Sequence, residues 1–359
     1  MKEFYALLLV AFLGNAASRT ARMGSAFATL EEGWGFLAAL AAAFSLGRLA
    51  SSFLGGELSK KYGSKVTSLG LASLGATGLG YALLPPSYYP LLRAFHGFSA
   101  GFTWPSLQAI TMSKVPREYR GRASSLYFVS GNLAWFFAFA LGGLLAESAL
   151  VPSALALFAL SLAVLAFKGK AVEERRKGKG KAFVPPLSAL VMTSIALGIM
   201  TVLVNTEVAV AVFGREFGKA FGGLLLAAAA LVGSIISYFL NKKLIDISES
   251  HLSMLLPAVG ASLSGFLISA PPPLSALGLF STKALTMWWR SSALGLARAG
   301  DVGRRVGAFN AAGDFGRLLG SLASSLGPWT VALLPALSLA LGTLAWAHSR
   351  STLSTSSAE

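Results

Sequence analysis

The chain has 359 residues, of which 54% are hydrophobic and 13% charged, and its mean hydropathy is +0.65. Soluble chains carry about 25% charged residues, so this composition excludes an ordinary soluble protein and indicates an integral membrane protein. Cysteine is absent and histidine is scarce, which excludes thiolate metal sites and leaves no basis for a metal site of another kind. The net charge of +15 does not indicate nucleic-acid binding, because the basic residues cluster between apolar runs.

Twelve apolar runs follow one another along the chain, each near the length of about 20 residues that a membrane-spanning helix requires. The predicted spans cover residues 4–28, 34–55, 66–85, 91–112, 123–146, 151–167, 187–213, 222–240, 252–270, 274–297, 306–326 and 330–347. The basic segment 168–186 ends in two prolines, which is typical of a flexible linker. We therefore predict an all-α integral membrane protein with two pseudo-symmetric six-helix bundles, residues 1–167 and 187–359, joined by a cytoplasmic linker.

Basic residues gather on one side of this arrangement. Placing the N-terminus in the cytoplasm puts 21 of the 30 lysines and arginines in cytoplasmic segments, whereas Arg215 and Lys219 fall on the outer side. Cytoplasmic loops of membrane proteins carry such an excess of positive charge. An odd number of spans would break the pattern, so we expect a multi-pass plasma-membrane protein with both termini in the cytoplasm.

The two halves share a local pattern at a constant offset. Residues 46–54 resemble residues 232–240, which lie 186 positions later. Each copy is followed by a basic segment, an apolar span and a cluster of prolines. Parallel repeats are typical of transporters whose solute site lies between two halves near mid-membrane. Chance similarity between apolar sequences is the alternative.

Three short motifs carry a family resemblance. Residues 56–65 read Gly-Glu-Leu-Ser-Lys-Lys-Tyr-Gly-Ser-Lys, residues 93–105 contain Arg-x3-Gly-x3-Gly-x3-Pro, and residues 116–123 contain Arg-Gly-Arg-Ala. With these motifs the chain resembles the major facilitator superfamily, although Lys60 stands where that family has an acidic residue. The glycine spacing of 93–105 predicts a helix face that another helix approaches closely. The resemblance implies gating residues at four positions: Gly56, Lys61, Gly63 and Lys65.

Ionisable side chains inside membrane spans are costly and usually functional. Asn15, Arg19 and Arg22 recur at i, i+4 and i+7, so they form one stripe on the first helix. The resemblance implies that this helix lines a central cavity together with the fourth, seventh and tenth helices. The predicted substrate-binding residues are Asn15, Arg19, Arg22, Arg93, His96, Asn205, Glu207, Lys283 and Trp288. Snorkelling to the interface is the alternative for Arg22 and Glu207, and a structural role is the alternative for Arg93 and His96.

The eleventh predicted helix carries Asp314 and Arg317, which are spaced to neutralise each other along the helix. Arg48 on the second helix lies at a similar depth above the cytoplasmic end. In the family these two helices face each other across the two halves. An Arg48–Asp314 bridge that closes the cytoplasmic side is therefore our second hypothesis, and we assign Arg48, Asp314 and Arg317 to gating or coupling.

The charge within the predicted spans is mostly positive, which suits an anionic solute because guanidinium groups favour carboxylate and phosphate. We expect a secondary active transporter of a small, anionic organic solute, working in the membrane lipid as a monomer without a cofactor. Proton-coupled efflux of lipophilic, drug-like compounds is the alternative. A co-transported proton would use Glu207, Asp314 or His96, and sodium coupling and facilitated diffusion stay open. A polytopic enzyme lacks support, because no nucleophile–base set is evident.

Overall fold

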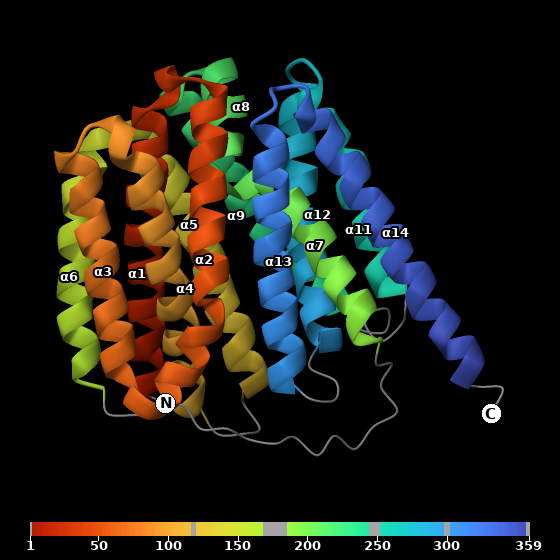
Figure 1. The fold of residues 1–359 in the computed structure, drawn as a ribbon, viewed down its shortest axis with the longest axis horizontal. Helices are drawn as coiled ribbons and strands as arrows, with labels where there is room; N and C mark the ends of the chain where they lie inside the picture. Colours follow the sequence, from red (N-terminus) through yellow and green to blue (C-terminus); the bar gives the residue numbers. More distant parts are fainter. Residues whose placement is uncertain (1, 116–119, 168–184, 244–251, 298–301, 357–359) are drawn as a thin grey trace. The chain divides into compact units, whose positions relative to one another are not determined.

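The computed structural model describes residues 2–115, 120–167, 185–243, 252–297 and 302–356 (Figure 1). Within these ranges the chain is helical apart from short connections, and no strand occurs. The predicted linker lies almost wholly outside them. The chain forms two compact units: unit 1 is Met1–Glu173 with Ala209–Leu231, and unit 2 is Glu174–Val208 with Val232–Glu359. The predicted bundles differ from these units in residues 209–231, and the bundle boundaries stay a prediction.

Unit 1 contains six long helices that lie beside one another (Figure 1): α1 (Lys2–Ala28), α2 (Trp34–Tyr62), α3 (Ser64–Leu83), α4 (Tyr89–Ser113), α5 (Arg120–Leu145) and α6 (Leu150–Leu165). The most extensive contacts join α2 to α4, α1 to α5 and α3 to α6. Leu71, Leu107 and Leu157 come from α3, α4 and α6 and are fully buried in a shared apolar core. Packing of these apolar faces against one another holds the helices in place.

Glycines bring α2 and α4 into backbone contact. A Cβ at Gly47 would lie 1.9 Å from the carbonyl oxygen of Ala94, and a Cβ at Gly97 would lie 2.0 Å from that of Phe44. Gly101 faces α2 as well, with Ser51 Oγ 2.0 Å from a Cβ there. We call the contact made by Gly47, Gly97 and Gly101 the α2–α4 seam. Its close approach confirms the packing face predicted for residues 93–105.

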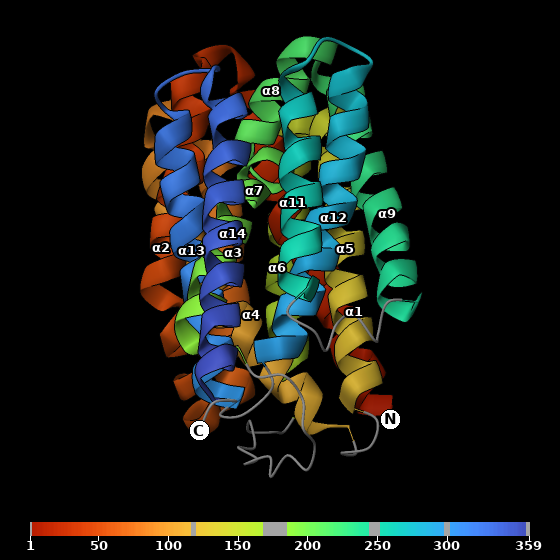
Figure 2. The same cartoon turned by 90° about the vertical axis from the view of Figure 1, so that its right-hand side faces the viewer.

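Unit 2 contains five long helices: α7 (Leu187–Asn205), α11 (Leu252–Phe266), α12 (Leu274–Ala297), α13 (Val302–Ser324) and α14 (Thr330–Ser356). Figure 2 shows α11 to α14 in front of α7. Here α7 packs against α13 and α14, and α11 packs against α12 and α14. Glycine again permits a backbone contact, because a Cβ at Gly316 of α13 would lie 2.2 Å from the carbonyl oxygen of Ile195. This contact places the polar residues of α7 and α13 against one another.

The predicted span 187–213 is not one continuous helix. The chain breaks after Asn205, because Thr206 is extended at φ −131° and ψ −178°, and α8 (Glu207–Phe217) and α9 (Lys219–Lys243) follow. The Thr206 hydroxyl donates to the carbonyl of Val202 at 2.6 Å and accepts from the backbone N–H of Val208 at 3.2 Å. A hydroxyl in this position caps the first turn of the following helix. Thr206 thus ends α7 and starts α8.

The segment after the second predicted span is also different from the expectation. The second predicted span ends at residue 55, yet α2 continues to Tyr62, so Gly56 and Lys61 lie on the helix. Lysine, serine and leucine carry no strong penalty inside a helix. The turn falls at Gly63, whose φ of +57° suits glycine. A single residue therefore connects α2 to α3.

Among the residues that the structure describes, seven segments are long and apolar enough to cross a membrane, judged by length and composition: Lys2–Ala28, Trp34–Ser52, Ser64–Leu83, Val129–Leu165, Leu187–Phe217, Lys219–Ile236 and Thr330–Ser351. Two of these ranges each cover a pair of consecutive helices. The remaining predicted spans fall on helices that are shorter or carry more polar and charged residues, as α13 does with Asp314 and Arg317. The all-helical membrane fold is confirmed, and the number of helices that cross the bilayer stays a prediction.

Candidate functional site

Two arginines meet inside unit 1. Arg93 of α4 is fully buried, and its Nη2 donates to the carbonyl oxygen of Arg22 at 3.0 Å and to Ser25 Oγ at 2.9 Å on α1. Its guanidinium also lies 4.9 Å from the centre of the Tyr81 ring. Arg22 is 5% exposed and lies 3.6 Å from the centre of the Phe44 ring. Aromatic faces offset part of the cost of burying these cations.

His96 lies beside the two arginines. One ring nitrogen is 2.9 Å from Ser18 Oγ of α1, and the other is 3.4 Å from the hydroxyl of Tyr81 on α3. The ring also packs edge-on against Phe44 of α2 at 5.7 Å. Helices α1 to α4 therefore converge on one buried polar cluster, which contains three of the predicted substrate-binding residues: Arg22, Arg93 and His96.

The other two residues of the predicted α1 stripe are bound elsewhere in unit 1. Asn15 is buried and donates from Nδ2 to the carbonyl of Ala11 at 2.8 Å, one turn earlier on its own helix. Arg19 donates to the carbonyl of Gly131 on α5, and its guanidinium lies 4.6 Å from the centre of the Trp135 ring. Of the three residues of the stripe, Arg22 thus lies in the polar cluster, Arg19 contacts α5 and Asn15 binds its own helix.

In unit 2 the predicted binding residues gather at the break between α7 and α8. Lys283 of α12 is 2% exposed, and its Nζ donates to Asn205 Oδ1 and lies 3.4 Å from the carbonyl oxygen of Val204. Glu207 is buried at the first residue of α8, where a helix dipole favours a carboxylate. Trp288 is also buried, further along α12.

A second polar contact in unit 2 joins α13 to α7. Arg317 forms an ion pair with Asp314 on its own helix, and its Nε lies 3.3 Å from Thr201 Oγ1. Asp314 is 1% exposed. Arg317 borders a narrow cavity between α7, α12 and α13 that is also lined by Arg290 and Asn310. The Asp314 carboxylate thus has a partner within unit 2, and the Arg48–Asp314 bridge stays a prediction.

The other predicted gating residues lie on α2 and at its end in unit 1. Arg48 is half-buried on α2, and Lys65 is exposed at the start of α3. Lys61 Nζ lies 5.0 Å from the centre of the neighbouring Tyr62 ring, and Gly63 forms the turn. The structure describes Gly56 only as part of α2. The gating role of all these residues stays a prediction.

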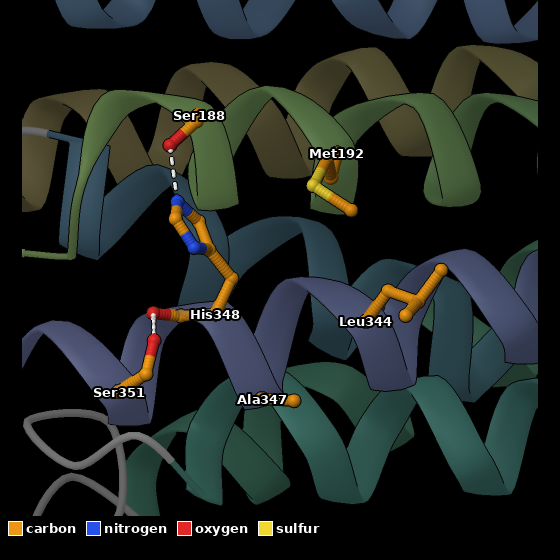
Figure 3. A pocket seen from close by; sticks show the side chains of 6 residues that line it. All are labelled: Ser188, Met192, Leu344, Ala347, His348 and Ser351. Atoms are coloured by element: carbon orange, nitrogen blue, oxygen red, sulfur yellow. Dashed lines mark hydrogen bonds between the residues drawn. The ribbon is translucent and has the colours of Figure 1, made fainter.

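An open pocket of about 540 Å³ lies between α7 and α14 (Figure 3). It is formed by the first turns of α7 and by the C-terminal part of α14. Met192 and Leu344 give it an apolar wall, and Ser188 Oγ lies 2.7 Å from Nε2 of His348 at its polar end. No predicted site residue lines it. Among the described residues, no group of histidine and acidic side chains is placed to hold a metal ion.

Sequence reasoning missed the neutral partners in these clusters. In unit 1 the Phe44 and Tyr81 rings each pack against one buried guanidinium group, and Ser25 accepts a hydrogen bond from Arg93. In unit 2 Thr201 accepts one from Arg317. Aromatic and hydroxyl residues are common in membrane helices, so a single sequence contains no signal that sets these four apart. Arg290 falls within the predicted span 274–297, and its place beside Arg317 in one cavity could not be foreseen from the sequence.

Comparison with known proteins gives a family and several structural neighbours. The model of the Major Facilitator Superfamily matches residues 7–321. Similar solved structures include a mutant of the nucleoside transporter NupG, with 15% identity, coverage of 96% of this chain and 99% of that chain, and a TM-score of 0.74. A D-xylose–proton symporter has 14% identity, coverage of 95% and 97%, and a TM-score of 0.74. The peptide transporter POT in complex with sulfate has 11% identity, coverage of 96% and 95%, and a TM-score of 0.75.

At these identities the solved structures show a shared fold and nothing finer. The search of curated proteins gave no significant match.

Proposed function

The chain belongs to the major facilitator superfamily, as its motifs predicted, and on this premise we propose that it moves a small organic anion across the plasma membrane by alternating access. Membership makes it a multi-pass membrane protein and a secondary transporter rather than an enzyme. The structural neighbours transport nucleosides, D-xylose with protons, and peptides, so the fold alone favours no solute class. The choice of an anion rests on charge.

The observation that carries the proposal is the excess of buried positive charge. Within the described residues of the spans, Arg22, Arg93 and Lys283 are each at most 5% exposed. The buried carboxylates there are Glu207 and Asp314, and Asp314 is already held by an arginine. Half-buried arginines add to the excess, since Arg19, Arg48, Arg290 and Arg317 are cations too. Charge inside a membrane span is costly, so an anionic solute that offsets it would bind favourably.

The test is uptake and efflux by the purified chain in proteoliposomes. Organic anions, sugars and lipophilic cations would be compared, each with and without a pH gradient. We expect organic anions to be transported at least tenfold faster than the other classes. Preferred movement of lipophilic cations out of the compartment, driven by protons, would instead support the efflux alternative and overturn the proposal. Preferred sugar transport would overturn it as well.

A matched pair of variants ties the result to the cations within the spans. Arg19→Gln removes a half-buried charge that contacts α5, whereas Arg215→Gln removes an exposed charge on α8. We expect Arg19→Gln to slow anion transport about tenfold, the size of one charge-assisted hydrogen bond. Arg215→Gln should leave transport unchanged. Equal effects of the two substitutions would mean that general surface charge, and not a site, governs the rate.

The finer features of the transporter are part of the same proposal. Both termini lie in the cytoplasm, and the chain works as a monomer. The location of the termini is testable by attaching a tag to each end and labelling the tags in intact cells. A dependence of anion uptake on an imposed pH gradient would indicate a co-transported proton, for which Glu207, Asp314 and His96 are the titratable candidates within the spans. If uptake does not depend on the pH gradient, the transport is coupled to sodium or proceeds by facilitated diffusion.

A further inference from the structure

The break between α7 and α8 separates two backbone groups that an uninterrupted helix would pair. In an α-helix the carbonyl of residue i accepts a hydrogen bond from the N–H of residue i+4, so Val204 and Val208 would be partners if the apolar segment Leu187–Phe217 were one helix. Instead α7 ends at Asn205 and α8 begins at Glu207. Lipid offers no partner for a backbone group inside a membrane. The two groups at the break therefore need other partners from the protein.

Side chains supply both partners. The N–H of Val208 donates to Thr206 Oγ1 at 3.2 Å, and the carbonyl oxygen of Val204 accepts from Lys283 Nζ at 3.4 Å. Thr206 lies at the break itself, whereas Lys283 comes from α12. The Lys283 ammonium also donates to Oδ1 of Asn205, the last residue of α7. One lysine thus binds both a backbone carbonyl and a side chain at the end of α7.

The surroundings of Lys283 fit this role. The residue is 2% exposed, and Gly233 of α9 makes room for its stem. A Cβ at residue 233 would lie 2.9 Å from Lys283 Cγ and 3.2 Å from the backbone nitrogen of Ala284. The C-terminal end of a helix carries a partial negative charge, so the end of α7 stabilises an ammonium group beside it. Packing and charge therefore both favour Lys283 as the partner of this helix end.

The sequence across the break does not itself forbid a helix. Residues 202–208 read Val-Leu-Val-Asn-Thr-Glu-Val, with neither proline nor glycine. Asparagine, threonine and valine are only moderately weaker helix formers than alanine. The backbone leaves the helix at Thr206, which is extended. Sharp breaks without proline or glycine arise where a side chain enters the backbone ladder, and here the Lys283 side chain from α12 does so.

We propose that Lys283 is a positioning residue that keeps α7 and α8 apart, and that the two join into one continuous helix when its ammonium group leaves the break. Val204 and Val208 then pair with each other, which satisfies both groups without a side chain. Glu207 is buried at the first residue of α8, so the break sets the direction of this carboxylate. This role is distinct from the solute binding predicted for Lys283, and it does not depend on the class of solute.

Two isotope-labelling patterns report on the break directly. Valine is followed by asparagine once in the sequence, at Val204–Asn205, and glutamate is followed by valine once, at Glu207–Val208. A chain with carbonyl-¹³C valine and ¹⁵N asparagine therefore gives one NMR signal for the Val204 carbonyl. A chain with carbonyl-¹³C glutamate and ¹⁵N valine gives one signal for the Val208 amide. Both signals would be recorded on the purified full chain in nanodiscs.

Substitutions of Lys283 then test the charge. Lys283→Met keeps an unbranched stem against Gly233 and removes the ammonium, so both signals should shift to positions typical of a helix interior. Lys283→Arg retains a cation and should leave both signals near their original positions. Lys219→Met removes a lysine at the first residue of α9 and is the matched control, which should change neither signal. Equal shifts in Lys283→Met and Lys283→Arg, or no shift in Lys283→Met, would overturn the proposal.

A milder variant covers the case in which Lys283→Met does not fold, which gel filtration would show. Asn205→Ala removes one of the two acceptors of the ammonium and leaves the lysine in place. We expect the Val208 signal of this variant to shift part of the way towards the position of a helix interior. A Val208 signal that stays where it is in the unchanged chain would contradict the role of Lys283.

Uptake measurements separate this role from solute binding and from the proposed function. A lysine that only binds solute would slow transport when replaced by methionine and leave both NMR signals unchanged; the proposal would then be wrong and the proposed function would stand. If both signals shift as expected but the proteoliposomes transport no organic anion, Lys283 holds the break and the proposed function is wrong.

Discussion

Replacing Gly97 by alanine tests how tightly the α2–α4 seam is packed. The new Cβ would lie 2.0 Å from the carbonyl oxygen of Phe44, and its next neighbours, at 2.8 and 3.0 Å, are backbone atoms of the same residue. Ordinary van der Waals contact begins at 3.4 Å, so α2 and α4 must separate locally by about 1.4 Å. A flexible side chain could rotate away, whereas a helix backbone cannot.

The size of the effect follows from two opposing terms. Overpacking of a filled site costs about 1–3 kcal/mol, and a clash with backbone on this scale belongs at the upper end. Alanine is better than glycine inside a helix by about 1 kcal/mol. Gly97→Ala should therefore lower the free energy of unfolding by about 2 kcal/mol. Gly35→Ala, on α2 where nothing lies within 4 Å of the new Cβ, should raise it by up to about 1 kcal/mol.

The assay is equilibrium unfolding of the purified variants in detergent, followed by tryptophan fluorescence. Gly101→Ala provides an intermediate case, because its nearest atom at 2.0 Å is the Ser51 hydroxyl, which can rotate. We expect the destabilisation to fall in the order Gly97, Gly101, Gly35. If Gly97→Ala is as stable as Gly35→Ala, the helices separate without cost and the close packing of the α2–α4 seam has no energetic weight.

Three further outcomes are expected. Thr206→Val removes the cap of α8 and should lower the free energy of unfolding by about 1 kcal/mol; an unchanged unfolding midpoint would contradict the capping role. Lys283→Gln should slow organic-anion uptake about tenfold, with Lys283→Arg in between; equal rates would remove it from the binding set. Reversing both charges of the predicted Arg48–Asp314 bridge should restore the transport that either reversal abolishes; rescue by an Asp314–Arg317 exchange alone would favour the pair within α13.

The helical fold and the family were predictable, because both depend on properties that a single sequence displays. Apolar runs of membrane length are read directly from composition, and the spacing of Arg93, Gly97 and Gly101 is a pattern along one helix face. The break after Asn205 was not predictable. Neither proline nor glycine marks it, and hydropathy is high on both sides. The structure there depends on a hydroxyl cap at Thr206 and on Lys283, which comes from a distant helix.

The candidate site was foreseeable in part for the same reason. Charges within apolar spans stand out, so Arg22, Arg93 and Lys283 were found, and the structure shows them deeply buried. The direction in which each of these side chains points depends on tertiary packing. Arg19 shares a helical stripe with Arg22 yet contacts α5, whereas Arg22 turns to Phe44 of α2. Periodicity places residues on a face, and the partners that each side chain finds depend on which helices pack there.

The connection between α2 and α3 limits how unit 1 can move. Gly63 alone separates Tyr62 from Ser64, and two peptide steps span at most about 7 Å. The ends of the two helices are consequently tethered with no slack, whatever conformation the transporter adopts. Any tilting of α2 must therefore move the start of α3 as well, so the connected ends of the two helices move together. Displacement between them has to be taken up at their far ends or by bending of the helices themselves.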